Sequence, residues 1–485
     1  MTRRVVQAVP NEILDIIFDN CCDTNLFSVA DAKLVDSLEE IPALTLSSVC
    51  SQWRRVGLSS SRIWSRISLD LEGEFPPGED QLSMILTIFI SRSRQQPLAL
   101  SICISDSPTP EYWCPYEPLA ILCREYRRWS SFTFQCWSTF TFHDWTVDHL
   151  FRSADLDSSL PLEAFPVLVD LDLALGDSLS FFTVRAPSLQ QLNLHQCSHQ
   201  VWKSSLSPLD HVTHLRLDKI WSLFIQGTIS ELTGLHSLDV DDGMDVWDLI
   251  WLDSRGDEAT PAACPSIEVL NVSHYEDRTF DSIFPYISLP SLRTLCLDCA
   301  QDFVETGHFW PSFNPFMAFV KRSSFLLTTL CIKCVAFSDS ELIYLLYHIP
   351  TLLDLTVMGP NINYGEDEAM LTGRFLQSLH VGTSSLLQPT TPLVPRLRCL
   401  TINVGGYFFD DKAALDLVES RWAPHGSKYG IDCLRSFTII FRARMNVPKA
   451  YDALNSFKKD GMKITVACKR YGFLWKARRA CSLGS

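Results

Sequence analysis

Hydrophobic residues recur along most of this chain in a six-residue phrase with an apolar residue at positions 1, 4 and 6. Positions 4 and 6 of such a phrase point to one side of an extended strand, and positions 3, 5 and 7 point to the other side. Position 3 is polar in nine of the eleven phrases. The pattern therefore predicts a row of short strands that each bury one face. The phrases begin at Leu168, Leu189, Val212, Leu235, Ile267, Leu292, Leu327, Leu352, Leu376, Leu397 and Leu434.

Successive phrases begin 21 to 37 residues apart, and most steps lie between 21 and 25 residues. Steps of this length are typical of leucine-rich repeats, and the longer ones indicate insertions. Segments with helical spacing lie between phrases, at 316–321, 340–348 and 412–422. We therefore predict an α/β fold in which a leucine-rich-repeat solenoid, or horseshoe, has a parallel concave sheet and convex helices. The alternative is a parallel β-helix, which would place strands where these helical segments lie.

The first sixty-five residues carry helical patterns instead. Pro10 suits the first position of a helix and Glu12 lies in its first turn. The apolar residues that share one face of this helix are Ile13, Leu14, Ile17 and Phe18. A second helical pattern ends at Gly57, a residue type that often ends helices. Its apolar residues are Leu46, Val49, Cys50, Trp53 and Val56.

These N-terminal patterns resemble the F-box, especially as it occurs in the large families of mushroom-forming fungi. The resemblance rests on a Pro-x-Glu-Ile-Leu opening at Pro10, a Val-Cys-x-x-Trp-Arg helix at Val49 and a Ser-x-x-aliphatic-Trp close at Trp64, in this order. The segment 21–42 between the two helices is longer than the usual connection by about one helix. For this insertion we expect an acidic helix from Ala30 to Ile41.

The resemblance implies that the chain is the substrate-recognition subunit of a Skp-cullin-F-box ubiquitin ligase. The F-box would bind a Skp-type adaptor and, through it, a cullin scaffold, and the repeats would hold a protein substrate. Two alternatives remain: a leucine-rich-repeat scaffold or inhibitor not linked to ubiquitin, and a solenoid hydrolase. Carried onto this sequence, the adaptor-facing residues are Val9, Pro10, Ile13, Leu14, Ile17, Phe18, Leu46, Val49, Cys50 and Trp53, some of which must instead form the core of the module.

The patterns divide the chain into four regions. We expect an F-box-like helical module at 1–68, transitional and degenerate first repeats at 69–160, leucine-rich repeats at 161–445 and a C-terminal cap with a basic tail at 446–485. Within the transitional region, Leu82 to Ile90 is predicted to be a helix and Pro97 to Ile102 to lead into a strand.

Charge indicates what the strand face would bind. The chain of 485 residues carries a formal charge of −15, which argues against a general nucleic-acid-binding protein, because such a protein needs a basic face. Acidic residues at the outward strand positions predict a nearly continuous acidic strip that attracts a basic segment of the substrate. We predict that these substrate-binding residues are Asp170, Asp172, Asp218, Asp239, Asp241, Asp298 and Asp354.

The sequence offers little indication of catalysis, metal binding or a membrane span. The sequence contains no P-loop, His-Glu-x-x-His or Gly-x-Ser-x-Gly motif, so we expect no enzyme and no cofactor. Two Cys-x-x-Cys pairs begin at Cys296 and Cys331, but residues three apart on a strand point to opposite faces, which argues against a metal site. Seventeen cysteines without a signal-peptide or membrane-span pattern indicate reduced thiols in the cytoplasm or nucleus.

Overall fold

A computed structural model provides the coordinates of the chain, which divides into two compact units, Met1–Phe224 and Ile225–Ser485. Each unit is described by itself. The structure describes residues 9–30, 33–34, 41–72, 79–105, 116–137, 147, 151, 160–161, 164–174, 179–195, 209–218, 232–242, 261–274, 283–299, 313–335, 337–359, 371–381, 392–404, 409–422, 430–442 and 444–469.

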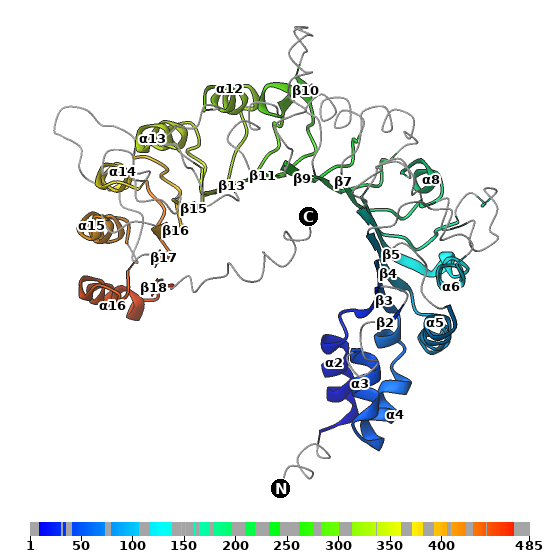
Figure 1. The fold of residues 1–485 in the computed structure, drawn as a ribbon. Coiled ribbons are helices and arrows are strands. Elements are labelled where there is room, and N and C mark those ends of the chain that lie inside the picture. Colours follow the sequence, from blue (N-terminus) through cyan, green and yellow to red (C-terminus); the bar gives the residue numbers. More distant parts are fainter. Residues whose placement is uncertain are drawn as a thin grey trace, which may run out of the picture. The chain divides into compact units, whose positions relative to one another are not determined.

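The first unit begins with helices and continues into a parallel sheet (Figure 1). Its helices at the N-terminal end are α2 (Asn11–Cys21), α3 (Pro42–Ser48) and α4 (Ser51–Ser59), followed by the 3-10 turn η1 (Arg62–Trp64). Neighbouring strands of the sheet are parallel and in the order β1, β3, β4, β5, β6, β7 and β8. Their bounds are Asn25–Ala30, Arg66–Glu72, Leu98–Ser105, Trp129–Trp137, Asp170–Leu173, Gln191–His195 and His214–Asp218.

The second unit contains a parallel sheet in the strand order β9, β11, β13, β14, β15, β16, β17 and β18. The bounds are Ser237–Asp242, Val269–His274, Thr294–Cys299, Thr329–Lys333, Asp354–Met358, Cys399–Val404, Ser436–Phe441 and Lys463–Cys468. The short strands β10 (Ala262–Ala263) and β12 (Ile287–Ser288) pair with each other apart from this sheet. Each sheet is open, so the repeats stack without closing a barrel.

Helices connect successive strands, as the sequence predicts. In the first unit they include α5 (Glu79–Ser93), α6 (Glu117–Cys123) and α8 (Leu179–Thr183). In the second unit they include α12 (Phe313–Ser323), α13 (Asp339–Tyr347), α14 (Gly373–Leu379), α15 (Asp411–Arg421) and α16 (Asn455–Lys459). Figure 1 shows the helices of the second unit along the outer side of its strands. A parallel β-helix would have strands at these positions, so that alternative is wrong and the repeats are solenoid-like.

The repeats are held together by the alternation of side chains along each strand. Strand β13 alternates half-buried and buried residues from Thr294 to Cys299, and its Leu295 and Leu297 are at most 1% exposed. Burying one leucine stabilises a fold by about 1.5–3 kcal/mol, and leucine neighbours leucine from strand to strand. For example, Leu295 is in register with Leu270 on one side and Leu330 on the other. Each repeat therefore extends the core of its neighbour.

The phrase that begins at Leu376 is an exception. Each of the other ten phrases runs into a described strand, whereas Leu376 lies in helix α14. Apolar residues at positions 1 and 4 are also neighbours on a helix, and Phe375, Leu376 and Leu379 are all buried there. Thr372 decides in favour of the helix, because its hydroxyl accepts a hydrogen bond from the Phe375 N–H and caps the first turn. Position 5 of this phrase is His380, which would point outward from a strand; instead, His380 follows the last residue of α14, so this expectation is also wrong.

Two further expectations in the N-terminal module are wrong. The insertion contains strand β1, which pairs with β3, and the short strand β2 (Lys33–Leu34), which pairs with β1, so Ala30 to Ile41 is not one helix and 1–68 is not purely helical. The second helical pattern is interrupted between α3 and α4. Gly57 lies inside α4 rather than at its end. A Cβ atom on residue 57 would lie only 3.3 Å from the Cβ of Ser47 in α3. Glycine at this position allows α3 and α4 to pack closely.

Candidate functional site

Helix α2 divides its apolar residues between the module's core and its surface. Leu14 and Phe18, four residues apart, are 1% and 0% exposed. Ile13, Ile16 and Ile17 are 47%, 58% and 41% exposed. Residues three and four positions apart lie side by side on a helix, so the three isoleucines form one continuous stripe. Hereafter this set is the isoleucine stripe.

The residues around α4 complete a small core beneath the stripe. The ring of Phe18 meets the ring of half-buried Trp53 edge-on, with 5.1 Å between the ring centroids. Trp64 is fully buried, and its indole N–H donates a hydrogen bond of 2.8 Å to the Gly57 carbonyl. The Arg92 guanidinium carbon lies 4.4 Å from the centroid of the Trp64 ring. The third motif of the F-box resemblance thus joins α4 to α5, which follows β3.

Asn25 forms the polar centre of the module, although no sequence motif singled it out. Its buried amide nitrogen donates hydrogen bonds of 2.8 Å to the carbonyls of Ile63 and Arg66, and its amide oxygen accepts one of 3.1 Å from the Ala43 N–H. Ala43 is in the first turn of α3, whose N–H groups have no partner within the helix. A buried amide that satisfies three distant backbone groups fixes their relative positions.

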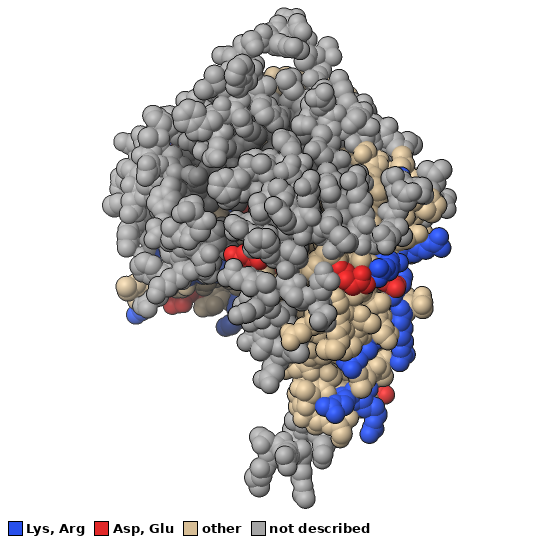
Figure 2. All heavy atoms as spheres, turned by 45° about the vertical axis from the view of Figure 1, so that its right-hand side comes forward, with Lys and Arg blue, Asp and Glu red and all other residues tan. Residues whose placement is uncertain are grey.

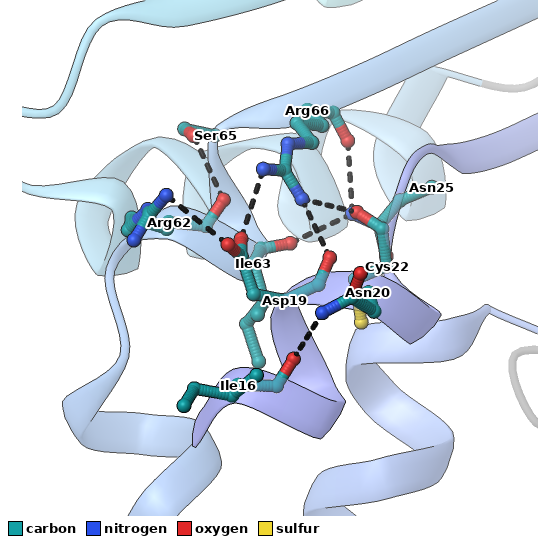
Figure 3. Close-up of polar contacts among 9 residues, drawn as sticks. All are labelled: Ile16, Asp19, Asn20, Cys22, Asn25, Arg62, Ile63, Ser65 and Arg66. Atoms are coloured by element: carbon teal, nitrogen blue, oxygen red, sulfur yellow. Dashed lines mark hydrogen bonds and ion pairs between the residues drawn. The ribbon is translucent and has the colours of Figure 1, made fainter. Parts of the chain in front are cut away.

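Arg66 holds the other end of α2 (Figure 3). Its guanidinium donates hydrogen bonds of 2.9 and 3.0 Å to the carbonyls of Asp19 and Cys22, and it pairs with the Asp19 carboxylate at 2.8 Å. Arg62 contacts the same carboxylate at 3.1 Å. A cation at the C-terminal end of a helix is favourable because the last carbonyls carry partial negative charge. These contacts hold α2, and with it the isoleucine stripe, against the start of β3.

The structure separates the residues that the resemblance assigned to the adaptor. Pro10, Ile13, Ile17 and Val49 are exposed, and Val9, Leu46, Cys50 and Trp53 are half-buried. Leu14 and Phe18 belong to the module's core. The Cys50 sulfur accepts a hydrogen bond from the Trp53 N–H and so caps α4. Ile16 was missing from the predicted set, although its spacing from Ile13 was visible in the sequence.

Basic side chains lie near the exposed apolar residues of the module. Arg54 and Arg55 on α4 are exposed, and 61% of the Arg62 side chain is exposed. Figure 2 shows blue Lys and Arg atoms beside broad tan areas, with little red, at the height where Figure 1 draws α2, α3 and α4. On the face that Figure 2 shows, the described surface of the module is therefore apolar with a basic component.

The strand face of the first unit carries a cluster of two carboxylates and one histidine. His195 on β7 lies between its neighbours, with Nδ1 2.8 Å from the Asp218 carboxylate of β8 and Nε2 3.1 Å from the Asp172 carboxylate of β6. The hydrogen bonds to Asp172 and Asp218 raise the pKa of His195 from 6.5 to about 9, against the effect of burial. His195 therefore carries a proton at neutral pH and compensates much of the charge of the two aspartates.

The other predicted acids of the strand faces also have partners or are partly buried. The Asp170 carboxylate accepts a hydrogen bond of 3.2 Å from the Ser131 hydroxyl, and burial raises its pKa. In the second unit, Asp298 pairs with Lys333 at 2.9 Å, and Asp239 accepts a hydrogen bond of 2.6 Å from the Asn271 amide. Burial raises the pKa of Asp354. Asp241 is half-buried.

These pairings correct the expected electrostatics of the strand face. The acids do lie at the outward positions, but charge compensation by His195 and Lys333 interrupts the predicted acidic strip. Each described part of the face is a mixed-charge surface that presents carboxylates, amides and hydroxyls. The sequence pattern left the charge of His195 open, because its raised pKa depends on strands 23 residues away on either side.

Neither a metal-binding cluster nor a membrane-spanning helix is found among the described residues. No group of three or more His, Cys, Asp or Glu side chains in these ranges could hold a metal ion. Cys296 and Cys331 are half-buried at outward positions, whereas Cys299 and Cys334 are buried, as the strand register predicts. No helix in the described parts is long and apolar enough to cross a membrane. Cys197, at a consensus position of the repeat, lies outside the described residues.

Comparisons with known proteins show a weak likeness to a solved structure. No family model matches the chain, and no curated protein matches it. A solved structure, the crystal structure of the Rad7 and Elc1 complex in yeast, is similar over 61% of this chain and 85% of the matched chain, with 17% sequence identity and a TM-score of 0.27. Conclusions about the site therefore rest on the geometry of this chain's own residues.

Proposed function

We propose that this chain is the substrate-recognition subunit of a Skp-cullin-F-box ubiquitin ligase. The observation that carries the proposal is the isoleucine stripe, together with exposed Pro10 and Val49, on a module whose core is already filled by Leu14, Phe18 and Trp64. Such residues remain apolar and exposed in the free chain, and contact with another protein would remove them from water. The motifs of the module resemble those that bind a Skp-type adaptor.

In this proposal the chain contributes no catalytic group. The adaptor joins the module to a cullin scaffold, and the repeats hold a protein substrate on their strand faces, so that transfer is accelerated by proximity. The mixed-charge surface provides carboxylates for a basic segment of the substrate. In the first unit these carboxylates belong to Asp170 and to the two aspartates beside His195. We place this assembly in the cytoplasm or nucleus, where the thiols would remain reduced.

Co-expression with a Skp-type adaptor followed by pull-down tests the proposal. The informative variant is Ile13→Asp with Ile17→Asp, because both side chains are exposed and the helix should stay folded. About half of each side chain is still available for burial, which corresponds to roughly 1 kcal/mol per residue before the cost of desolvating a carboxylate is added. We expect adaptor affinity to fall at least about tenfold to a hundredfold.

Leu326→Asp is the matched control, because this leucine is 66% exposed and lies in the second unit. It should leave adaptor binding unchanged. A substitution of Leu14 would be a poor test, since this residue is buried and its loss would unfold the module. Wild-type-like binding by the isoleucine double variant would contradict the proposal.

A leucine-rich-repeat scaffold not linked to ubiquitin is the second candidate. The observation in its favour is that β1, which directly follows α2, pairs with β3. The helices could therefore serve only to cover the first strand of the sheet. In that case the wild-type chain itself would bind no Skp-type adaptor in the pull-down.

A further inference from the structure

Two cysteines face each other on adjacent strands of the second unit. Cys296 on β13 and Cys331 on β14 are register partners, and both occupy outward, half-buried positions. Neighbouring parallel strands lie about 4.8 Å apart. The Cα atoms of a disulfide are usually about 4.4–6.8 Å apart, so the backbone already has the spacing that a cross-strand disulfide requires.

This juxtaposition is specific to one place in the described sheets. In the described parts of both units, no other two cysteines are register partners on neighbouring strands. Cys103 on β4 is also half-buried and outward, but its partners are Asp70 and Gln135. Cys399 on β16 is half-buried too, and its partners are Asp354 and Ser436. These two cysteines are natural controls for the facing pair.

The surroundings make the two thiols unequal. The Cys331 thiol donates a hydrogen bond to the Cys296 sulfur, which lowers the pKa of Cys296, and the nearby Lys333 ammonium acts in the same direction. The same hydrogen bond, together with burial, raises the pKa of Cys331. Burial raises the pKa of Cys103 to about 11. Burial also raises the pKa of Cys399. Because the thiolate is the nucleophile, Cys296 should react before Cys103 and Cys399.

We propose that Cys296 and Cys331 form a redox modification site that hydrogen peroxide converts into a cross-strand disulfide. The Cys296 thiolate attacks one oxygen of the peroxide, the O–O bond breaks, and the leaving hydroxide takes up a proton to give water. Cys296 is then a sulfenic acid. The Cys331 sulfur attacks the Cys296 sulfur, the S–O bond breaks, and a second water leaves with the Cys331 proton. The two thiols lose two electrons, which reduce the peroxide.

The disulfide would change the strand face next to the ion pair of Asp298 and Lys333. These two residues lie two positions beyond the cysteines on the same strands and are themselves register partners. A thiol reductant would restore the starting state by thiol–disulfide exchange. The modification depends only on contacts within the second unit, so it would occur whether or not the chain binds an adaptor.

Mass spectrometry of the full chain tests the site. The reduced protein is treated with a graded series of hydrogen peroxide concentrations, blocked with an alkylating reagent and digested without reductant. We expect a linked pair of peptides that contains Cys296 and Cys331 and disappears after reduction. Cys296 and Cys331 should lose their alkylation at least about ten times faster than Cys103 and Cys399 do.

Two variants separate the roles of the pair. In Cys331→Ser the hydroxyl still donates to Cys296 but cannot form a disulfide, so Cys296 should accumulate as a sulfenic acid that dimedone traps. In Cys296→Ser, Cys331 should stay unmodified under the same conditions. Cys103→Ser should leave the linked peptides unchanged. Oxidation of Cys103 as fast as Cys296, or disulfides formed only between molecules, would overturn the proposal.

Discussion

Replacing His195 by Gln tests whether the two aspartates of the first unit hold a cation between them. Glutamine retains a donor and an acceptor but cannot carry the charge. Because the pKa of His195 rises from 6.5 to about 9 on folding, protonation stabilises the folded state by about 1.36 kcal/mol for each unit of this difference, or about 3 kcal/mol. Only 15% of the His195 side chain is exposed, so solvent screens this interaction weakly.

The sign of the pH dependence follows from the raised pKa. Below pH 6.5 the histidine is protonated in both the folded and unfolded states, and the whole stabilisation is present. As the pH rises through about 9, the folded state loses the proton and the stabilisation disappears. The wild type should therefore exceed His195→Gln in stability by about 3 kcal/mol at pH 6 and by far less at pH 10.

Urea unfolding of both proteins across this pH range measures the difference, and histidine NMR signals measure the pKa directly. His214→Gln is the matched control, because His214 lies on the next strand, is exposed, and has Nδ1 2.8 Å from the hydroxyl of its neighbour Thr213. Because His214 is exposed, its replacement should cost little stability. A His195 pKa near 6.5, or a stability difference that does not change with pH, would refute the reasoning.

Three further substitutions probe packing inside the units, two in the first unit and one in the second, and urea unfolding measures their effect. Asn25→Ala leaves three buried backbone groups without their partner and should cost about 2–4 kcal/mol, and a cost below 1 kcal/mol would contradict its central role. Gly57→Val should cost about 1–3 kcal/mol by separating α3 from α4, whereas helix propensity alone predicts a gain. Arg421→Ala should cost about 3–5 kcal/mol, because the buried guanidinium donates hydrogen bonds to the carbonyls of Leu379, Leu393 and Val394. An unchanged unfolding midpoint would show that these contacts contribute nothing.

The sequence by itself determined the repeating strands and their orientation. Each strand is specified by residues two positions apart, such as Leu295 and Leu297, so a local pattern is enough to assign both the strand and its buried side. The apolar spacing of α2 likewise predicted the helix and included Ile13 and Ile17 among its apolar residues, but it missed Ile16. These features are determined within a few residues of chain, and the spacing of side chains repeats along them.

Tertiary contacts decided which of two locally possible structures formed. The phrase at Leu376 fits a strand and a helix equally well, and the Thr372 cap with the burial of Phe375 selected the helix. The insertion formed β1 because β3 offered an open parallel strand to pair with. Propensity at these positions is weak compared with hydrogen bonding and burial, so neighbouring elements determine the outcome.

Tertiary structure alone also decided the chemistry of the candidate sites. Ile13 and Leu14 are adjacent and equally apolar, yet only packing against α4 and η1 made one a surface residue and the other a core residue. The charge of His195 and the facing of Cys296 and Cys331 arise from strands that are 23 and 35 residues apart in the sequence. Pairing between strands brings such groups within hydrogen-bonding distance, and this proximity, which no local pattern encodes, sets their pKa values and reactivity.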